Sequence, residues 1–163
     1  MSQANHAPSA ISDYVTRAIP DDERLWVPQA ENVWFRPLLL NRVAGEWCNL
    51  LRVRKSGVLS RHRHPAPVHG FVIKGSWRYL EHDWIATAGS FIFEPAGEAH
   101  TLVVPEDATE PAIILFVVAG ALVFVNDDGE FLMYEDGFSM LELTREHYRG
   151  AGIDLSRADA LIR

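Results

Sequence analysis

Short hydrophobic runs separated by turn signals, with no helical stretch between them, constrain this chain more than any other feature. From residue 32 to about residue 136, β-branched and aromatic runs alternate with turn-forming segments such as VAGE, KSG, TAG, EPAGE, PEDATEP and NDDGE. Closely spaced strands without crossover helices are typical of a β-sandwich or β-barrel. A chain of 163 residues is long enough to bury one such core without disulfides.

The two ends of the chain differ from this strand-rich middle. Residues 1–22 are polar and contain two prolines, which predicts a loosely ordered arm or one that lies on another subunit. Residues 23–137 are expected to form the barrel, and residues 138–163 a helical segment packed on it. In that last segment Ser139 and Glu142 have the spacing of a capping box. The sequence thus predicts an all-β, single-domain barrel with a short C-terminal helical segment.

Charge and cysteine content narrow the class of partner. Lys and Arg number 15 against 22 Asp and Glu, and the resulting net charge of −7 disfavours nucleic acid or an anionic membrane. The single cysteine, Cys48, cannot form an internal disulfide, and the N-terminus lacks the basic start and apolar run of a signal peptide. No apolar run reaches the roughly 18 to 20 residues of a membrane span. We therefore expect a cytoplasmic protein whose partners are small molecules.

Three of the seven histidines crowd into residues 62–69. Side chains alternate faces along a strand, so His62 and His64 point to the same side, where two imidazoles could bind one metal ion. Such pairs also occur by chance on protein surfaces. The later segment GSFIFEPAGEAH runs through a tight turn to His100, and this turn could carry His100 back toward the pair. We expect His62, His64 and His100 to bind one metal ion inside the barrel.

The two histidine segments resemble the two conserved motifs of the cupin superfamily. Gly89, Pro95, Gly97 and His100 match the second motif, G-x5-P-x-G-x2-H. Residues 57–75 resemble the first motif, which is built around H-x-H. The resemblance implies a jelly-roll barrel that holds a metal ion on the histidines of both motifs.

One departure from the superfamily pattern is informative. Cupins usually place a glutamate shortly after the H-x-H pair, often as a fourth ligand, and His69 stands there in this chain. A subset of cupins with three histidines and no ligand glutamate is similar throughout. Within it, the segments HRHPAPVHGFVIKGSWRYLEHDW, FEPAGEAHTLVV and FVNDDGEF are similar to those of 2,4'-dihydroxyacetophenone dioxygenases and, more distantly, of acetylacetone dioxygenases.

This resemblance implies a non-haem Fe(II) enzyme of aromatic catabolism. It would use O2 to cleave a carbon–carbon bond next to a carbonyl, in an aromatic hydroxyketone such as 2,4'-dihydroxyacetophenone. Three neutral imidazoles leave a divalent ion its full charge, which suits an anionic chelating substrate. Imidazoles also bind Zn, Ni, Cu or Mn. The alternatives are another three-histidine cupin enzyme, acting as a β-diketone dioxygenase, isomerase or lyase, and a non-catalytic metal-binding sensor, for which we expect an additional partner-binding domain.

Two further residues are candidates for catalytic roles. His69 would be a fourth ligand, an acid or base beside the metal, or a packed histidine. It shares a strand face with Phe71 and Ile73, and it lies near the metal if that face lines the barrel. Glu94 precedes the turn to His100 and could orient a ligand histidine or handle a substrate proton, or pair with an arginine on the barrel rim.

The remaining apolar and aromatic segments are assigned to packing, within the barrel or between subunits. Five aromatic residues are expected to fill the core rather than contact a substrate, namely Trp77, Tyr79, Trp84, Phe91 and Phe93. The run AIILFVVAGALVFV is more apolar than a half-exposed strand requires. We therefore expect a homodimer or a larger even homo-oligomer, to which the N-terminal arm contributes.

Overall fold

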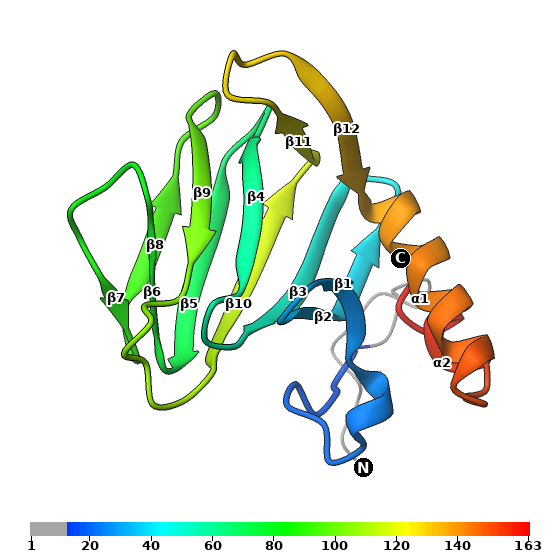
Figure 1. Ribbon diagram of the computed structural model, residues 1–163. Helices are drawn as coiled ribbons and strands as arrows, with labels where there is room; N and C mark the ends of the chain where they lie inside the picture. Colours follow the sequence, from blue (N-terminus) through cyan, green and yellow to red (C-terminus); the bar gives the residue numbers. More distant parts are fainter. Residues whose placement is uncertain (1–12) are drawn as a thin grey trace, which may run out of the picture.

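Two antiparallel β-sheets pack face to face in the computed structural model, which describes residues 13–163 (Figure 1). One sheet has the strand order β1-β2-β3-β10-β5-β8 and the other has the order β12-β11-β4-β9-β6-β7. The strands are β1 (Val27–Ala30), β2 (Val33–Asn41), β3 (Glu46–Val53), β4 (Val58–Arg63), β5 (Val68–Lys74), β6 (Ser76–Tyr79), β7 (Ala86–Thr87), β8 (Phe91–Glu94), β9 (Ala99–Val103), β10 (Ala112–Ala119), β11 (Ala121–Val125) and β12 (Phe131–Asp136). The helices are the 3-10 helix η1 (Glu23–Leu25), α1 (Gly137–Gly150) and α2 (Ser156–Asp159). The predicted jelly-roll barrel with a short C-terminal helical segment is confirmed.

The main core lies between the two sheets. Alternate residues of each strand point inward, as the two-residue period of a strand requires. Inward side chains of the first sheet include Phe35, Leu51, Val72 and Ile114, and they belong to one buried cluster with Leu59, Trp77, Leu102 and Leu122 of the second sheet. Helix α1 lies beside β2 and β12 and adds Met140, Leu141 and Tyr148 to the same cluster (Figure 1).

The N-terminal cap of α1 differs from the predicted one. A carboxylate oxygen of Asp136 accepts hydrogen bonds from the backbone N–H groups of Phe138 and Ser139, and the Ser139 hydroxyl accepts one from the backbone N–H of Asp136. Ser139 is therefore the third helical residue and not the cap. The predicted pairing of Ser139 with Glu142 was wrong because Asp136, an equally good capping residue, comes first along the chain.

The predicted N-terminal arm is described only in part, because residues 1–12 lie outside the described residues. Residues 13–22 form no helix or strand, and Tyr14 and Ala18 pack against buried apolar clusters of the same chain. The guanidinium of Arg163 lies 4.7 Å from the centre of the Tyr14 ring. Within residues 13–163, none of the helices has the length and apolar character needed to cross a bilayer.

A second apolar cluster lies on the outer face of the first sheet. Its buried members are Trp26, Leu38, Leu50 and Ile113, and Trp34, Cys48, Ile73 and Leu115 are partly buried against them. On β5 and β8 the same face carries Phe71, Phe91 and Phe93, whose side chains are 45%, 66% and 58% exposed. The expectation that Phe91 and Phe93 fill the core was wrong, because the inward positions of β8 are Ile92 and Glu94. Apolar side chains therefore extend across the outer face of this sheet from β2 to β8, with Arg52 and His69 among them.

Candidate metal centre

Three buried histidines from two neighbouring strands lie together inside the barrel. His62 on β4 is paired with His100 on β9, and His64 follows directly after β4. One ring nitrogen from each histidine lies within 4.8 Å of the others, and each of the three residues is at most 2% exposed. The structure therefore brings together the three histidines that the sequence predicts as metal ligands.

Local backbone features of β4 and of the turn before β9 produce this arrangement. The pairing of β4 with β9 is irregular between Leu59 and His62, and such a bulge lets both side chains point inward although three positions separate them. In the turn between β8 and β9, Gly97 has a φ of 93°, which glycine adopts without strain. Its N–H donates a 2.8 Å hydrogen bond to the carbonyl of His64, so the turn that leads to His100 is fixed against the end of β4.

The protonation states of these histidines suit a metal ligand. Burial, followed by the neighbouring His64, lowers the pKa of His62 to about 4. Burial is also the main cause that lowers the pKa of His100, with His62 second. Both imidazoles are therefore neutral at pH 7. His62 Nδ1 lies 2.7 Å from the carbonyl of Ser60, and because a carbonyl can only accept, Nδ1 carries the proton and Nε2 keeps its lone pair.

Unpaired nitrogens indicate what the cluster could hold. Within residues 13–163, neither ring nitrogen of His64 or of His100 makes a hydrogen bond, although all four atoms are buried and the Glu94 carboxylate lies 3.2 Å from His64 Nε2. Buried polar atoms are normally paired, so three rings that bring one nitrogen each to within 4.8 Å of the others call for a ligand. A divalent cation fits this set, because neutral imidazole is the commonest protein ligand for the ions of this class.

Glu94 at the end of β8 faces the same cluster. One carboxylate oxygen, Oε2, lies 3.2 Å from His64 Nε2 and 3.7 Å from His100 Nε2. The other, Oε1, accepts a 2.6 Å hydrogen bond from the Tyr79 hydroxyl. The rim arginines that were alternative partners pair with other glutamates, as in the 2.7 Å contact of Arg61 with Glu81. Of the roles predicted for Glu94, the structure supports one beside the histidines.

Tyr79 belongs to the site but was not predicted to do so. Its ring stacks on that of His100, with ring centres 3.8 Å apart and planes 5° apart. Burial, with Glu94 second, raises the pKa of Tyr79 well above its usual value, so the hydroxyl remains a donor to Glu94. The one signal in the sequence was the alternation of Trp77 and Tyr79 along a short strand, which indicates an inward position but not a role.

His69 was predicted to lie near the metal only if its strand face lines the barrel, and that face does not line it. On β5 the inward residues are Val68, Gly70 and Val72, so His69 points outward and is exposed. Its ring lies against the exposed Phe93, with ring centres 5.5 Å apart. A shift of one residue along a strand moves a side chain to the opposite face, and on β5 the buried face is the one that carries Val68 and Val72.

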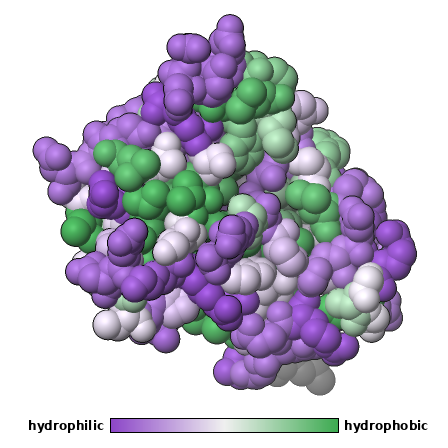
Figure 2. All heavy atoms as spheres, in the orientation of Figure 1, coloured by the Kyte–Doolittle hydropathy of each residue, from purple (hydrophilic) through white to green (hydrophobic). Residues whose placement is uncertain are grey.

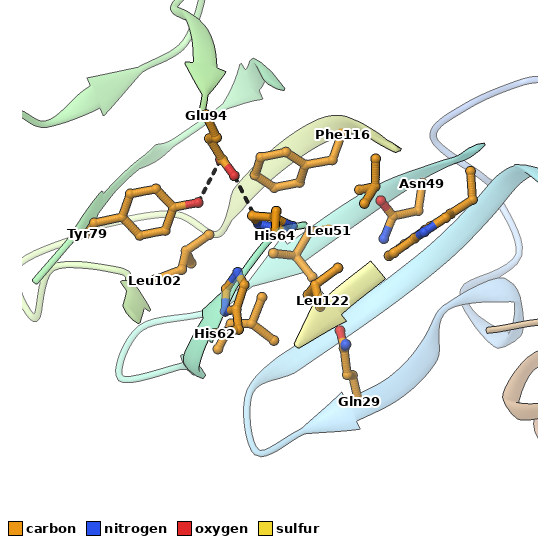
Figure 3. Close-up of a pocket in the computed structure, with 13 residues that line it drawn as sticks. Gln29, Asn49, Leu51, His62, His64, Tyr79, Glu94, Leu102, Phe116 and Leu122 are labelled. Atoms are coloured by element: carbon orange, nitrogen blue, oxygen red, sulfur yellow. Dashed lines mark hydrogen bonds and ion pairs between the residues drawn. The ribbon is translucent and has the colours of Figure 1, made fainter. Parts of the chain in front are cut away.

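A pocket adjoins the histidines (Figure 3). His62, His64, Glu94 and Tyr79 lie on one side of it, and Asn49 and Gln29 lie on the other (Figure 3). The rest of the wall is apolar and consists of Trp47, Leu51, Leu59, Leu102, Phe116, Val118 and Leu122. No lysine or arginine is among the described residues that line it. The histidines therefore lie next to a largely apolar wall whose described residues include no cationic side chain.

A second hollow lies next to this pocket. It shares Gln29 and Leu59 with the first and is also lined by Phe124, Leu132 and Met133. Leu132 and Met133 belong to β12, where apolar surface gathers near the top of the molecule (Figure 2). The Gln29 amide, which lines both hollows, donates a hydrogen bond to the buried carboxylate of Glu135.

Sequence comparison identifies a family for most of the barrel. Residues 16–123 match the family described as the ChrR cupin-like domain. Among curated protein sequences none matches this chain.

Several solved structures share the fold. An RmlC-like cupin protein from Ralstonia eutropha JMP134 is 29% identical, with a TM-score of 0.73 over 79% of this chain and 84% of that one. An acetylacetone dioxygenase from Acinetobacter johnsonii is 18% identical, with a TM-score of 0.71 over 88% of this chain and 97% of that one. The polyketide cyclase RemF from Streptomyces resistomycificus is 18% identical, with a TM-score of 0.53 over 94% of this chain and all of that one.

Proposed function

The chain belongs to the ChrR cupin-like domain family, and from this premise we propose that it is a metal-dependent dioxygenase. Its proposed substrate is an aromatic hydroxyketone such as 2,4'-dihydroxyacetophenone, cleaved at the carbon–carbon bond next to the carbonyl. The observation that carries the proposal is the group of buried, unpaired histidine nitrogens beside an apolar pocket. The fold shared with the acetylacetone dioxygenase supports the reaction class, and the similarity of the histidine segments to 2,4'-dihydroxyacetophenone dioxygenases supports the substrate.

His62, His64 and His100 would hold the metal ion, which we propose to be Fe(II). When bound, the ion would supply Lewis acidity toward the ketone and the electrons that O2 chemistry needs. Because imidazole is a neutral ligand, the charge of the divalent ion would remain to be balanced by the substrate. An ionised hydroxyketone, whose two oxygens are on adjacent carbons and can both bind the ion, is the kind of molecule that this ligand set favours.

To Glu94 we assign the role of accepting the proton that the substrate hydroxyl loses. Its Oε2 atom lies on the side of the histidine nitrogens, and its other oxygen is fixed by the Tyr79 hydroxyl. Because Tyr79 is itself stacked on His100, the direction in which the carboxylate points is linked to the position of a ligand. Tyr79 is thus a positioning residue for Glu94.

The apolar walls of the pocket have a different proposed role from that of Glu94. Leu51, Leu102 and Phe116 would pack against an aromatic ring and keep water away from the reacting carbonyl.

Oxygen consumption by the metal-loaded protein tests this function. A hydroxyketone R–CO–CH2OH and one O2 contain the atoms of two acids, RCOOH and HCOOH, so one formate is expected for each O2 consumed. The protein is loaded anaerobically with Fe(II), its iron content is measured, and oxygen uptake is followed with a panel of aromatic hydroxyketones and β-diketones. A zinc-loaded sample serves as the redox-inactive control. Iron-loaded protein that consumes no oxygen with any member of the panel would overturn the proposal.

A further inference from the structure

Two unpaired amide oxygens lie across the pocket from the histidines. Asn49 is on β3 in a row of inward residues that are otherwise apolar, with Trp47 and Leu51 on either side of it. The residue is only 4% exposed, and its Oδ1 atom has no hydrogen-bond partner among the described residues. A polar side chain in such a row is costly unless something inside the pocket pairs with it.

The second oxygen belongs to Gln29. Its Nε2 atom donates to the carboxylate of Glu135, and since a carboxylate only accepts, this bond fixes which end of the amide carries the oxygen. The remaining atom, Oε1, is buried and has no partner in the part of the chain that the structure describes. Both amides line the same pocket on the side away from the histidines (Figure 3). The far side of the pocket thus offers hydrogen-bond acceptors.

We infer that Asn49, assisted by Gln29, makes the site specific for ligands with a hydrogen-bond donor at the end opposite their metal-binding oxygens. This inference rests on the proposed function and narrows its substrate class. A hydroxyl on the aromatic ring supplies such a donor, whereas a bare phenyl ring or the methyl group of a simple β-diketone does not. The apolar residues between the two sides, such as Leu51 and Leu122, leave the ring itself without polar contacts.

Discrimination by a buried acceptor has a recognisable signature. A site built to pair with a substrate hydroxyl disfavours the analogue that lacks it, because binding the analogue leaves the acceptor without a partner. We therefore expect 2,4'-dihydroxyacetophenone to bind roughly tenfold or more tightly than 2-hydroxyacetophenone, which lacks the ring hydroxyl. The difference reports on the far side of the pocket, because both ketones present the same oxygens to the histidines.

Titration calorimetry on zinc-loaded protein measures this difference without turnover. In wild type the ring hydroxyl is expected to give the tighter complex, and in Asn49→Leu the two ketones should bind alike because the acceptor is gone. Asn49→Ala removes the same acceptor without adding bulk and replaces the leucine variant if that variant does not fold. Cys48→Ala is the matched control, because Cys48 is the neighbour of Asn49 on the outer face of β3 and should leave the preference intact.

The outcomes separate this inference from the proposed function. Equal affinity of wild type for the two ketones, or a preference that survives both Asn49 variants, would overturn the role of Asn49. Equal values of kcat/KM for oxygen uptake with the two ketones in the Fe(II)-loaded protein would also overturn it, while the dioxygenase function stands. If no ketone supports oxygen uptake but zinc-loaded protein keeps the Asn49-dependent preference, the dioxygenase function fails and the ligand specificity stands.

Discussion

Val68 on β5 and Glu94 on β8 are paired directly across the sheet, and both side chains point into the barrel. In the cupin pattern that the sequence resembles, a glutamate shortly after H-x-H supplies a carboxylate next to the histidines. The inward position on β5 is here the apolar Val68, and a carboxylate reaches the histidines from its cross-strand neighbour. The site therefore combines three histidines with a glutamate that comes from a different strand.

The three histidines are expected to be jointly necessary for metal binding. Replacing His62, His64 or His100 with alanine should each lower the bound metal to near zero, measured by elemental analysis after loading with one equivalent of Fe(II) or Zn(II). The barrel should stay folded by circular dichroism, because its core does not depend on the ion. His69→Ala is the control and should retain full metal, since His69 lies on the outer face. A variant of the three that binds metal as wild type does would remove that residue from the ligand set.

Glu94 is expected to affect turnover more than metal binding. Glu94→Gln keeps the size of the side chain and its contact with Tyr79 but removes the base, so iron content should be close to wild type while oxygen uptake falls roughly 10- to 100-fold. The pH dependence of uptake should change as well, which a merely structural role would not cause. Tyr79→Phe should give a smaller loss, because Glu94 keeps its charge and loses only its orienting hydrogen bond. Loss of iron from Glu94→Gln would instead identify Glu94 as a ligand.

The metal-free protein is expected to lose stability as the pH falls from about 6.5 to about 4. Burial lowers the pKa of His62 from 6.5 to about 4 in the folded state. Above this range the imidazole is neutral in both the folded and the unfolded chain. Within it, the unfolded chain takes up a proton that the folded chain does not, so the free energy of unfolding decreases with falling pH. Urea unfolding at a series of pH values should show this slope, and His62→Gln should reduce it without abolishing it, since His100 shifts in the same direction. A slope unchanged in the variant would contradict the assignment.

We propose that the chain forms a homodimer through the outer face of the first sheet. The exposed Phe71, Phe91 and Phe93 continue the buried outer cluster around Leu50 and Ile113, and exposed apolar surface of this extent marks an interaction site. A second copy is the occupant that we favour, because a sheet face that presents rings of one kind can pack against its own two-fold image.

Light scattering at micromolar concentration should give twice the monomer mass for wild type. The double variant Phe91→Ser and Phe93→Ser should shift the mass toward the monomer and should leave metal content unchanged, because both residues face away from the histidines. Leu143→Ser, at a partly exposed position on α1, is the control and should remain dimeric. Wild type that scatters as a monomer would contradict the proposal.

Much of the fold and the three histidines could be predicted because they depend on local sequence. The spacing of turn segments indicated a strand-rich barrel, and the alternation of side chains placed His62 and His64 on one face. The glycine of the turn before His100 is favoured by the backbone there, as the φ of 93° at Gly97 shows. Each of these features acts over a few residues and is therefore visible in the sequence.

Tertiary structure alone decided the rest of the site. His69 and Glu94 were both candidates, and the packing of the two sheets placed one outside and the other inside, because only one face of each strand can be buried. Asn49 and Gln29 had no distinguishing pattern, and they became notable because strands far apart in sequence left their oxygens in one pocket without a partner. The sequence determined which residues could bind a metal, whereas the register and packing of the sheets determined which other side chains share the pocket with them.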